Sequence, residues 1–506
     1  MFTAALVWYA RHSPWLMLPI GAALALAFAP FGAWPLAVVC PALLFLAWQG
    51  EAPRRAAKLG FVFTSGTFLA GTYWLYHSIY VIGHAPIWLT LIIMLGLVAA
   101  MGGFVALLGY VQARWLPRTG AMRWLLALPA GWLLIEWLRG WILSGFPWLS
   151  LGYAQIDAPL AALAPLVGVY GIGYAVALTA GALVALILGS NRVRCIAVAA
   201  ALPWLASAVW AHHQWTQTIG PPVSFALVQA AIPQDEKWQT ENRDATQILY
   251  RKLTTPHLGT QLIVWPESAL PELDFEVADY LREIWSAARA KGSDLVTGLM
   301  HWDEKTDTYY NGVVALSGAA QWYYKHHLVP FAEYFPVPSF VRSWLRLMSL
   351  PYSDFAPGPA DQPALDAAGI KLGLTVCYED SFGAEQLAAL RSATVLVNVT
   401  NDAWFGDSSA PHQHLEISRM RALEAGRPLL RATNDGITAQ IAADGHVLKS
   451  IAQFVPGVLT GTVQPRTGLT PYARVGNTPV IALATIAALF GIYLRRREPR
   501  SLNDEK

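Results

Sequence analysis

The sequence predicts a polytopic α-helical membrane protein with about eight transmembrane helices and one large extracytoplasmic α/β domain. Its 506 residues are 55% hydrophobic and only 13% charged, which is more apolar than a single soluble core requires. Apolar runs of membrane-spanning length fill residues 1–213, whereas residues 214–476 have mixed polarity. We therefore predict a membrane domain at 1–213, an α/β domain at 214–476, and a final transmembrane helix with a basic cytoplasmic tail at 477–506.

The apolar runs are long enough to cross a bilayer. A hydrocarbon core of roughly 30 Å requires about 20 apolar residues in each helix. Seven such runs precede residue 213 and an eighth lies near the end of the chain. The predicted spans are residues 14–30, 33–49, 60–80, 86–113, 124–143, 160–188, 195–211 and 479–494.

Basic residues predict the orientation of these helices. Each even-numbered run is followed by a basic cluster, whereas the loops at 83–86 and 144–159 contain no Lys or Arg. Because loops rich in Lys and Arg stay in the cytoplasm, both termini are predicted to be cytoplasmic. The clusters are Arg54, Arg55 and Lys58; Arg114, Arg118 and Arg123; Arg192 and Arg194; and Arg495, Arg496 and Arg497.

The composition also argues against several classes of protein. The formal net charge of +2 is too small to indicate a nucleic-acid partner. Cys40 and Cys195 lie in or beside apolar runs, far from Cys377, so no disulfide is predicted. His412 and His414 are two residues apart on a predicted helix and do not share a face, so we predict no metal and no cofactor.

In the outer domain, short β-branched runs alternate with amphipathic helices, which is typical of an α/β fold. The predicted strands are 223–229, 261–265, 294–300, 312–317, 321–325, 371–376, 395–399, 429–432 and 438–442. The predicted helices are 240–254, 275–291, 383–390 and 412–425.

Two polar side chains stand out in the fifth predicted span. Glu136 and Arg139 are three residues apart and share a helix face, where an unpaired charge would cost about 2.5–3.5 kcal/mol. They form either an internal ion pair that fixes helix packing or, through Arg139, a site for a phospholipid headgroup. Trp148, just beyond this span, has the position of an interfacial anchor, and we also keep it as a site candidate.

An aromatic segment within the outer domain has two interpretations. Residues 340–348 alternate arginines with bulky apolar side chains. The segment is either a buried helix or an interfacial arm that dips toward the lipid surface and admits long-chain substrates.

Three reactive side chains stand where predicted strands end. Cys377 follows strand 371–376, Glu267 follows strand 261–265, and Lys325 ends strand 321–325. If these strands are neighbours, the three side chains converge in one pocket. Acyl transfer through a thioester needs a thiol nucleophile, a base and a positive donor for the oxyanion, and these residues supply one of each. Taken singly, each is weak evidence, because a lone Cys is often a core residue and a Glu after Pro often starts a helix.

The motifs around these residues resemble, in the same order, the Glu-Lys-Cys signatures of the nitrilase superfamily. They read WPES at 265–268, YKHHLVPF at 324–331 and CYE at 377–379. Within that superfamily the chain is similar to the apolipoprotein N-acyltransferase family over nearly its whole length. The further matching motifs are LRGW at 138–141, GFPW at 145–148, NDAWFG at 401–406, RPLLR at 427–431 and GLTPYAR at 468–474.

This resemblance implies an α-β-β-α sandwich in the periplasm, carried by a multi-pass protein of the bacterial inner membrane. It implies an acyl chain taken from a phospholipid such as phosphatidylethanolamine, a thioester on Cys377, and transfer to the α-amine of a diacylglyceryl-cysteine that begins an apolipoprotein. Apart from the bilayer, the implied partners are these two substrates, and the protein is expected to be a monomer.

The resemblance also implies supporting roles near the thioester for Glu333, Tyr378 and Glu379, and substrate contact for Trp238. Glu379 has the alternative of a hydrogen-bonded scaffold, and Tyr378 that of packing. A membrane-tethered amidase with the same triad remains a rival, because the fold does not fix whether water or an amine resolves the thioester. The second rival is a transporter or scaffold whose outer domain only binds a ligand. Transporters usually bury polar or charged residues along several helices, whereas here Glu136 and Arg139 are nearly alone.

Overall fold

The computed structural model describes residues 2–334 and 355–497. The chain divides into two compact units, which are treated separately. A helical unit comprises Met1–His213 and Val475–Lys506, and an α/β unit comprises Gln214–Arg474. The aromatic segment at 340–348 lies outside the described residues, so its two interpretations stay open.

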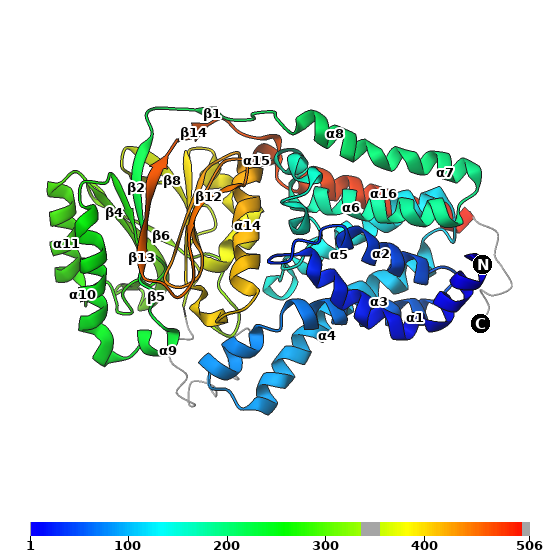
Figure 1. The fold of residues 1–506 in the computed structure, drawn as a ribbon, viewed down its shortest axis with the longest axis horizontal. Coiled ribbons are helices and arrows are strands. Elements are labelled where there is room, and N and C mark those ends of the chain that lie inside the picture. Colours follow the sequence, from blue (N-terminus) through cyan, green and yellow to red (C-terminus); the bar gives the residue numbers. More distant parts are fainter. Residues whose placement is uncertain (1, 335–354, 498–506) are drawn as a thin grey trace. The chain divides into compact units, whose positions relative to one another are not determined.

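The helical unit contains helices along all eight predicted spans (Figure 1). Among the described residues, four helices are long and apolar enough to cross a membrane: Ile87–Trp115, Pro159–Leu188, Asn191–Trp210 and Thr478–Arg497. His12–Ala27 and Leu36–Ala47 are shorter apolar helices. The helices are α1 (Phe2–Leu24), α2 (Leu36–Ala47), α3 (Pro53–Gly71), α4 (Ile87–Trp115), α5 (Leu128–Arg139), α6 (Ala164–Leu188), α7 (Asn191–Ala197), α8 (Leu202–Trp210) and α16 (Thr478–Arg497).

Glycines allow helices of this unit to approach closely. A Cβ on Gly66 of α3 would lie 2.2 Å from the Leu18 carbonyl oxygen of α1, and one on Gly21 would lie 1.8 Å from the Phe63 carbonyl oxygen. Small residues at such crossings bring backbones together where burial in lipid gives little driving force.

Glu136 and Arg139 both hold the loop that follows α5. The Arg139 guanidinium donates to the carbonyl oxygens of Phe146 (2.9 Å) and Trp148 (2.5 Å). The Glu136 carboxylate accepts from the Leu151 backbone N–H at 2.9 Å. These contacts support an internal structural role for the two charges, whereas headgroup binding by Arg139 stays a prediction.

Trp148 is not the lipid-facing anchor that its position in the sequence favours. Its side chain is only 2% exposed. The indole stacks on Phe146 at 6.1 Å between ring centroids and contacts Trp74 at 5.7 Å. Neighbouring aromatic rings cover it because the loop at 146–151 folds back and is held by the hydrogen bonds to Glu136 and Arg139.

The α/β unit contains all nine predicted strands and further strands that the pattern missed. β12 was missed because its residues are largely exposed, β13 because it contains two glycines, and β7 because it has three residues. The strands are β1 (Gln217–Thr218), β2 (Val223–Gln229), β3 (Leu262–Val264), β4 (Asp294–Asp303), β5 (Thr308–Leu316), β6 (Ala320–Tyr324), β7 (Leu365–Ala367), β8 (Ile370–Val376), β9 (Val395–Thr400), β10 (Leu429–Thr433), β11 (Thr438–Ile441), β12 (Val447–Ile451), β13 (Gly457–Val463) and β14 (Arg466–Thr467).

All strands except β1 and β14, which pair with each other, form two six-stranded sheets, in the orders β13-β2-β3-β4-β5-β6 and β12-β11-β10-β9-β8-β7. Residues such as Leu227, Val264 and Val376 pack between the two sheets. Helices α10 (Arg243–Thr254) and α11 (Ala278–Ala290) cover the outer face of the first sheet, and α14 (Ala410–Ala425) covers that of the second (Figure 1). The unit is thus the expected four-layered α-β-β-α sandwich.

Strand directions bring the reactive residues to one end of the sheets. β2, β3 and β4 run parallel, as do β8, β9 and β10. β5 is antiparallel to β4 and β6 to β5, so β6 ends at the same edge as β3 and β4. The prediction that the strands before Glu267, Lys325 and Cys377 are direct neighbours is wrong. β4 and β5 separate β3 from β6, and Cys377 follows β8, a strand of the other sheet.

Candidate active site

Glu267, Lys325 and Glu333 form a buried charged cluster where β3 and β6 end. The Lys325 ammonium lies 2.9 Å from the Glu333 carboxylate and 3.6 Å from the Glu267 carboxylate. Asn311 of β5 joins the two acids, since its side-chain amide donates to both at 2.8 Å. Lys325 is 1% exposed. The two carboxylates and Asn311 therefore hold the Lys325 ammonium in a fixed position at the end of the strands.

Burial and charge act on Lys325 in opposite directions. Burial lowers the pKa of the ammonium, but the negative charges of Glu333 and Glu267 outweigh it, so the pKa is raised above its usual value. Lys325 therefore stays positive at neutral pH, as a donor to a developing oxyanion requires.

Cys377 directly follows β8 and has φ of +51°, a left-handed conformation that is uncommon for a side chain. Burial raises the pKa of its thiol well above the ordinary value, and the Glu267 carboxylate raises it further against the opposing effect of Lys325. Thr400, at the end of β9, opposes this rise and lowers the pKa of the thiol. The resting thiol is therefore neutral and needs a base to become a nucleophile.

Glu379 fixes the turn that carries Cys377 to the segment after Lys325. Its carboxylate accepts from the backbone N–H groups of Val376 (2.7 Å), His326 (2.6 Å) and His327 (3.1 Å), and from the Tyr323 hydroxyl (3.0 Å). Burial raises the pKa of Glu379 to about 7, although these backbone donors favour the carboxylate. The contacts fit the scaffold interpretation, and a direct role at the thioester stays a prediction.

Two other predicted site residues lie at more exposed positions. Tyr378 is half-buried and packs edge-on against Phe382 at 5.1 Å, which fits the packing interpretation. Trp238 follows α9 (Gln234–Lys237) and is 41% exposed, so its indole is accessible to a ligand. Arg139 and Trp148 belong to the helical unit.

A buried network of charged side chains contacts the main chain of Cys377. The His414 imidazole lies 2.8 Å from Asp402 and 3.0 Å from Asp380, and its Nε2 is 3.1 Å from the Cys377 carbonyl oxygen. Arg431 donates to Asp402 at 2.8 Å and lies 3.5 Å from Asp380. All four ionisable groups are at most 1% exposed. Two cations and two anions thus neutralise each other and anchor the Cys377 backbone.

The protonation state of His414 gives a testable pH dependence. Burial and Arg431 lower the pKa of His414, but Asp380 and Asp402 outweigh them and raise it to about 9. A histidine with a raised folded-state pKa contributes its full stabilisation below the ordinary value of 6.5 and loses it as the pH rises through about 9. We therefore expect this group to lose about 3 kcal/mol of stability between those values.

Thermal unfolding of the detergent-purified protein between about pH 6 and about pH 9.5 measures this loss. The comparison is with His414→Gln, whose side chain is neutral throughout and lacks this stabilisation at every pH. The gap in stability between wild type and variant should shrink as the pH rises. A gap that stays constant would show that His414 does not change its charge in this range.

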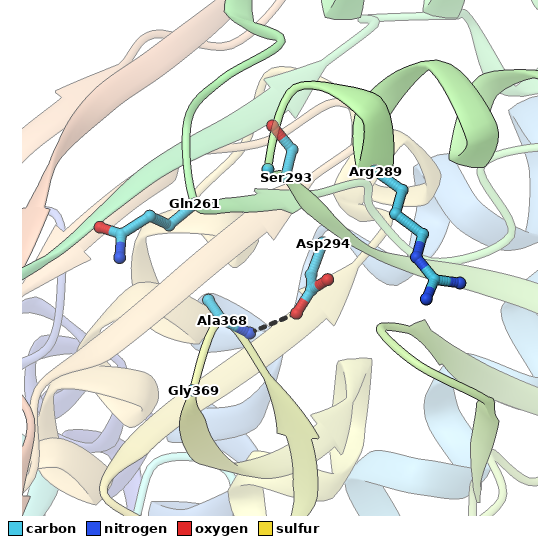
Figure 2. Close-up of a pocket in the computed structure, with 7 residues that line it drawn as sticks. Gln261, Arg289, Ser293, Asp294, Ala368 and Gly369 are labelled. Atoms are coloured by element: carbon cyan, nitrogen blue, oxygen red, sulfur yellow. Dashed lines mark hydrogen bonds between the residues drawn. The ribbon is translucent and has the colours of Figure 1, made fainter.

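Figure 2 shows a pocket of the α/β unit that lies away from these residues. It is lined by Gln261, Arg289, Gly292, Ser293, Asp294, Ala368 and Gly369. Gln261 directly precedes β3 and Asp294 begins β4, whereas Glu267 follows the carboxyl end of β3. The Asp294 carboxylate accepts a hydrogen bond from the Ala368 backbone N–H at 2.6 Å. This pocket therefore takes no part in the Glu267–Lys325–Cys377 site.

Sequence reasoning did not find several residues of the site. Asn311, Thr400 and Lys237, whose ammonium donates to the Glu267 main-chain carbonyl oxygen at 3.2 Å, lie outside the matching motifs. Asp380 directly follows the CYE motif, but it was assigned no role. Arg431 was included in a matching motif without a role. A polar residue within an apolar strand, as in Asn311 of β5, was the available signal, because a buried amide needs partners.

Two family models match the sequence. The apolipoprotein N-acyltransferase N-terminal domain matches residues 20–182, and the carbon-nitrogen hydrolase domain matches residues 224–472. A relative from Methylococcus capsulatus named apolipoprotein N-acyltransferase is 41% identical over 484 residues, covering 95% of this chain and 96% of the relative. One of the same name from Azotobacter vinelandii is 40% identical over 491 residues, covering 96% and 95%.

Among solved structures, Saccharomyces cerevisiae Nit3, a member of the nitrilase superfamily, covers 49% of this chain and 92% of its own, with 16% identity and a TM-score of 0.38. The sequence matches are far stronger, since they extend along nearly the whole chain through both units. On their strength the chain belongs to the apolipoprotein N-acyltransferase family, and residues 224–472 form its carbon-nitrogen hydrolase domain.

Proposed function

We propose that the chain transfers an acyl group from a phospholipid, such as phosphatidylethanolamine, to the α-amine of the diacylglyceryl-cysteine that begins an apolipoprotein. The observation that carries this proposal is the buried cluster of Glu267 and Lys325 whose charges act on the Cys377 thiol. The cluster combines a base, a fixed cation and a nucleophile, which is the minimum for acyl transfer through a thioester.

In the first half-reaction Glu267 accepts the thiol proton while Cys377 Sγ attacks the ester carbonyl carbon of the phospholipid. Lys325 stabilises the oxyanion of the tetrahedral intermediate. The carbon–oxygen bond of the ester then breaks, and the leaving alkoxide takes the proton from Glu267. The products are a thioester on Cys377 and a lysophospholipid.

In the second half-reaction the acceptor amine attacks the thioester carbonyl carbon and gives a proton to Glu267. The carbon–sulfur bond breaks, and the thiolate recovers that proton. The result is an amide on the lipoprotein and the free enzyme, so the two substrates react in turn by a ping-pong scheme. Glu333 and Asn311 keep Lys325 and Glu267 in place through both steps.

We further propose that the protein is a monomer of the bacterial inner membrane with eight spans. The basic clusters after the even-numbered spans support cytoplasmic termini and a periplasmic α/β unit. Trp238, which is exposed beside α9, is proposed to contact substrate, with Tyr378 and Glu379 supporting the thioester.

Intact-mass measurement tests the proposal. Wild-type protein incubated with phosphatidylethanolamine and no acceptor should gain one acyl mass, which neutral hydroxylamine removes and a diacylglyceryl-cysteine peptide discharges. Cys377→Ser should form no hydroxylamine-labile adduct. Cys195→Ser is the matched control, because Cys195 is exposed in the helical unit, and it should acylate normally. Rapid amide hydrolysis without any adduct would favour a tethered amidase instead.

A further inference from the structure

Helix α9 is attached to the site at two points. Of its four residues, Gln234 and Lys237 are buried, whereas Asp235 and Glu236 are exposed. The Gln234 side-chain oxygen accepts from the Asn401 amide at 2.6 Å. The Lys237 ammonium donates to the main-chain carbonyl oxygen of Glu267 at 3.2 Å. The helix therefore connects the residue after β9 with the proposed base after β3.

Lys237 is an unusual residue to bury at this position. Its side chain is 1% exposed, and in the described part of the chain its ammonium has one hydrogen-bond acceptor, the Glu267 carbonyl oxygen. Burial lowers the pKa of Lys237 to about 8, against the opposing effect of the Glu267 charge. Burying an ammonium with so few partners is unfavourable. An unbranched apolar side chain of the same length would fill the space without that penalty.

The backbone that this ammonium holds is itself strained. Ser268, which follows Glu267, has φ of +42°, a left-handed conformation that a side chain seldom adopts without support. The Glu267 carbonyl oxygen belongs to the peptide group that enters this conformation. Lys237 thus acts on the short segment whose geometry aims the Glu267 carboxylate toward Lys325 and Asn311.

We propose that Lys237 is a positioning residue for the base Glu267, because its ammonium holds the Glu267 main-chain carbonyl oxygen and with it the segment that carries the carboxylate. This inference rests on the proposed function, because it assigns Lys237 a task only if Glu267 takes protons. It also explains why a destabilising charge is buried here, since functional sites commonly retain groups that reduce stability.

Loss of this contact should affect the chemical step and not lipid binding. Lys237 contacts the Glu267 main chain from α9, whereas the Glu267 carboxylate faces Lys325 and Asn311. Without the Lys237 contact the base should be misplaced relative to the thiol, so the rate of acylation should fall.

The experiment compares full-length wild type with Lys237→Met. The measured quantities are the single-turnover rate of Cys377 acylation by phosphatidylethanolamine, its dependence on lipid concentration, and the melting temperature. We expect acylation at saturating lipid to fall at least about tenfold. Half-saturation by lipid should stay unchanged, and the melting temperature should be equal or higher.

Lys252→Met on α10 is the matched control, because Lys252 is exposed in the same unit, and it should behave as wild type. A rate at saturating lipid equal to that of wild type would overturn the inference, as would a fall in rate explained by a lower melting temperature. If Lys237→Met does not fold, Lys237→Leu, which also removes the donor, provides the same comparison. Absence of an acyl adduct on wild type would instead refute the proposed function.

Discussion

Glu267→Gln is expected to slow formation of the Cys377 thioester by about a thousandfold, within the range that general-base catalysis contributes. In the wild-type protein the Asn311 amide donates to the Glu267 carboxylate at 2.8 Å, and the glutamine keeps an oxygen that can accept this hydrogen bond. It cannot take the thiol proton, and burial keeps that thiol neutral at ordinary pH. The loss should therefore lie in the chemical step, with half-saturation by lipid nearly unchanged.

Single-turnover acylation followed by intact mass measures this loss. The control is Glu241→Gln, an exposed carboxylate in the same unit, which should acylate at the wild-type rate. Raising the pH should rescue Glu267→Gln, because hydroxide then replaces the missing base. A variant that acylates within a fewfold of wild type would mean that another group accepts the thiol proton.

Arg431→Met is expected to destabilise the α/β unit by about 3–5 kcal/mol, the usual effect of removing one partner of a buried ion pair. Arg431 is fully buried and lies 2.8 Å from Asp402 and 3.5 Å from Asp380. Without it, two buried carboxylates share the single positive charge of His414. Asp402 is affected most, since burial raises its pKa but the Arg431 and His414 charges outweigh burial and lower it.

Denaturant or thermal unfolding of the purified protein measures the change in free energy. Arg391→Met is the control, because Arg391 is exposed on the same unit and should lie within about 0.5 kcal/mol of wild type. The double variant Arg431→Met with Asp402→Asn should recover part of the loss, because it removes the uncompensated anion. A loss below about 1 kcal/mol would mean that solvent or local rearrangement replaces the arginine.

The sequence by itself determined most of the helices and strands and the three reactive residues that follow or end predicted strands. Local patterns were enough to predict the apolar spans and nine strands, because the spacing of apolar residues in a segment indicates which of its faces is buried. They also placed Glu267, Lys325 and Cys377 at or just after the ends of strands. The motifs around these residues extended the assignment from an α/β domain to a family. Local patterns were weakest for β12 and β13, whose exposed and glycine-containing sequences look like loops.

Only the tertiary structure decided which groups meet. Strand order places β4 and β5 between Glu267 and Lys325, and it makes Asn311 the bridge between the two carboxylates. The stacking of two sheets brings the charges of Glu267 and Lys325 to the Cys377 thiol. Folding likewise brings together four charged residues from separate segments next to the Cys377 main chain: Asp380, Asp402, His414 and Arg431. No local pattern encodes such contacts, because they depend on how distant strands pair and pack.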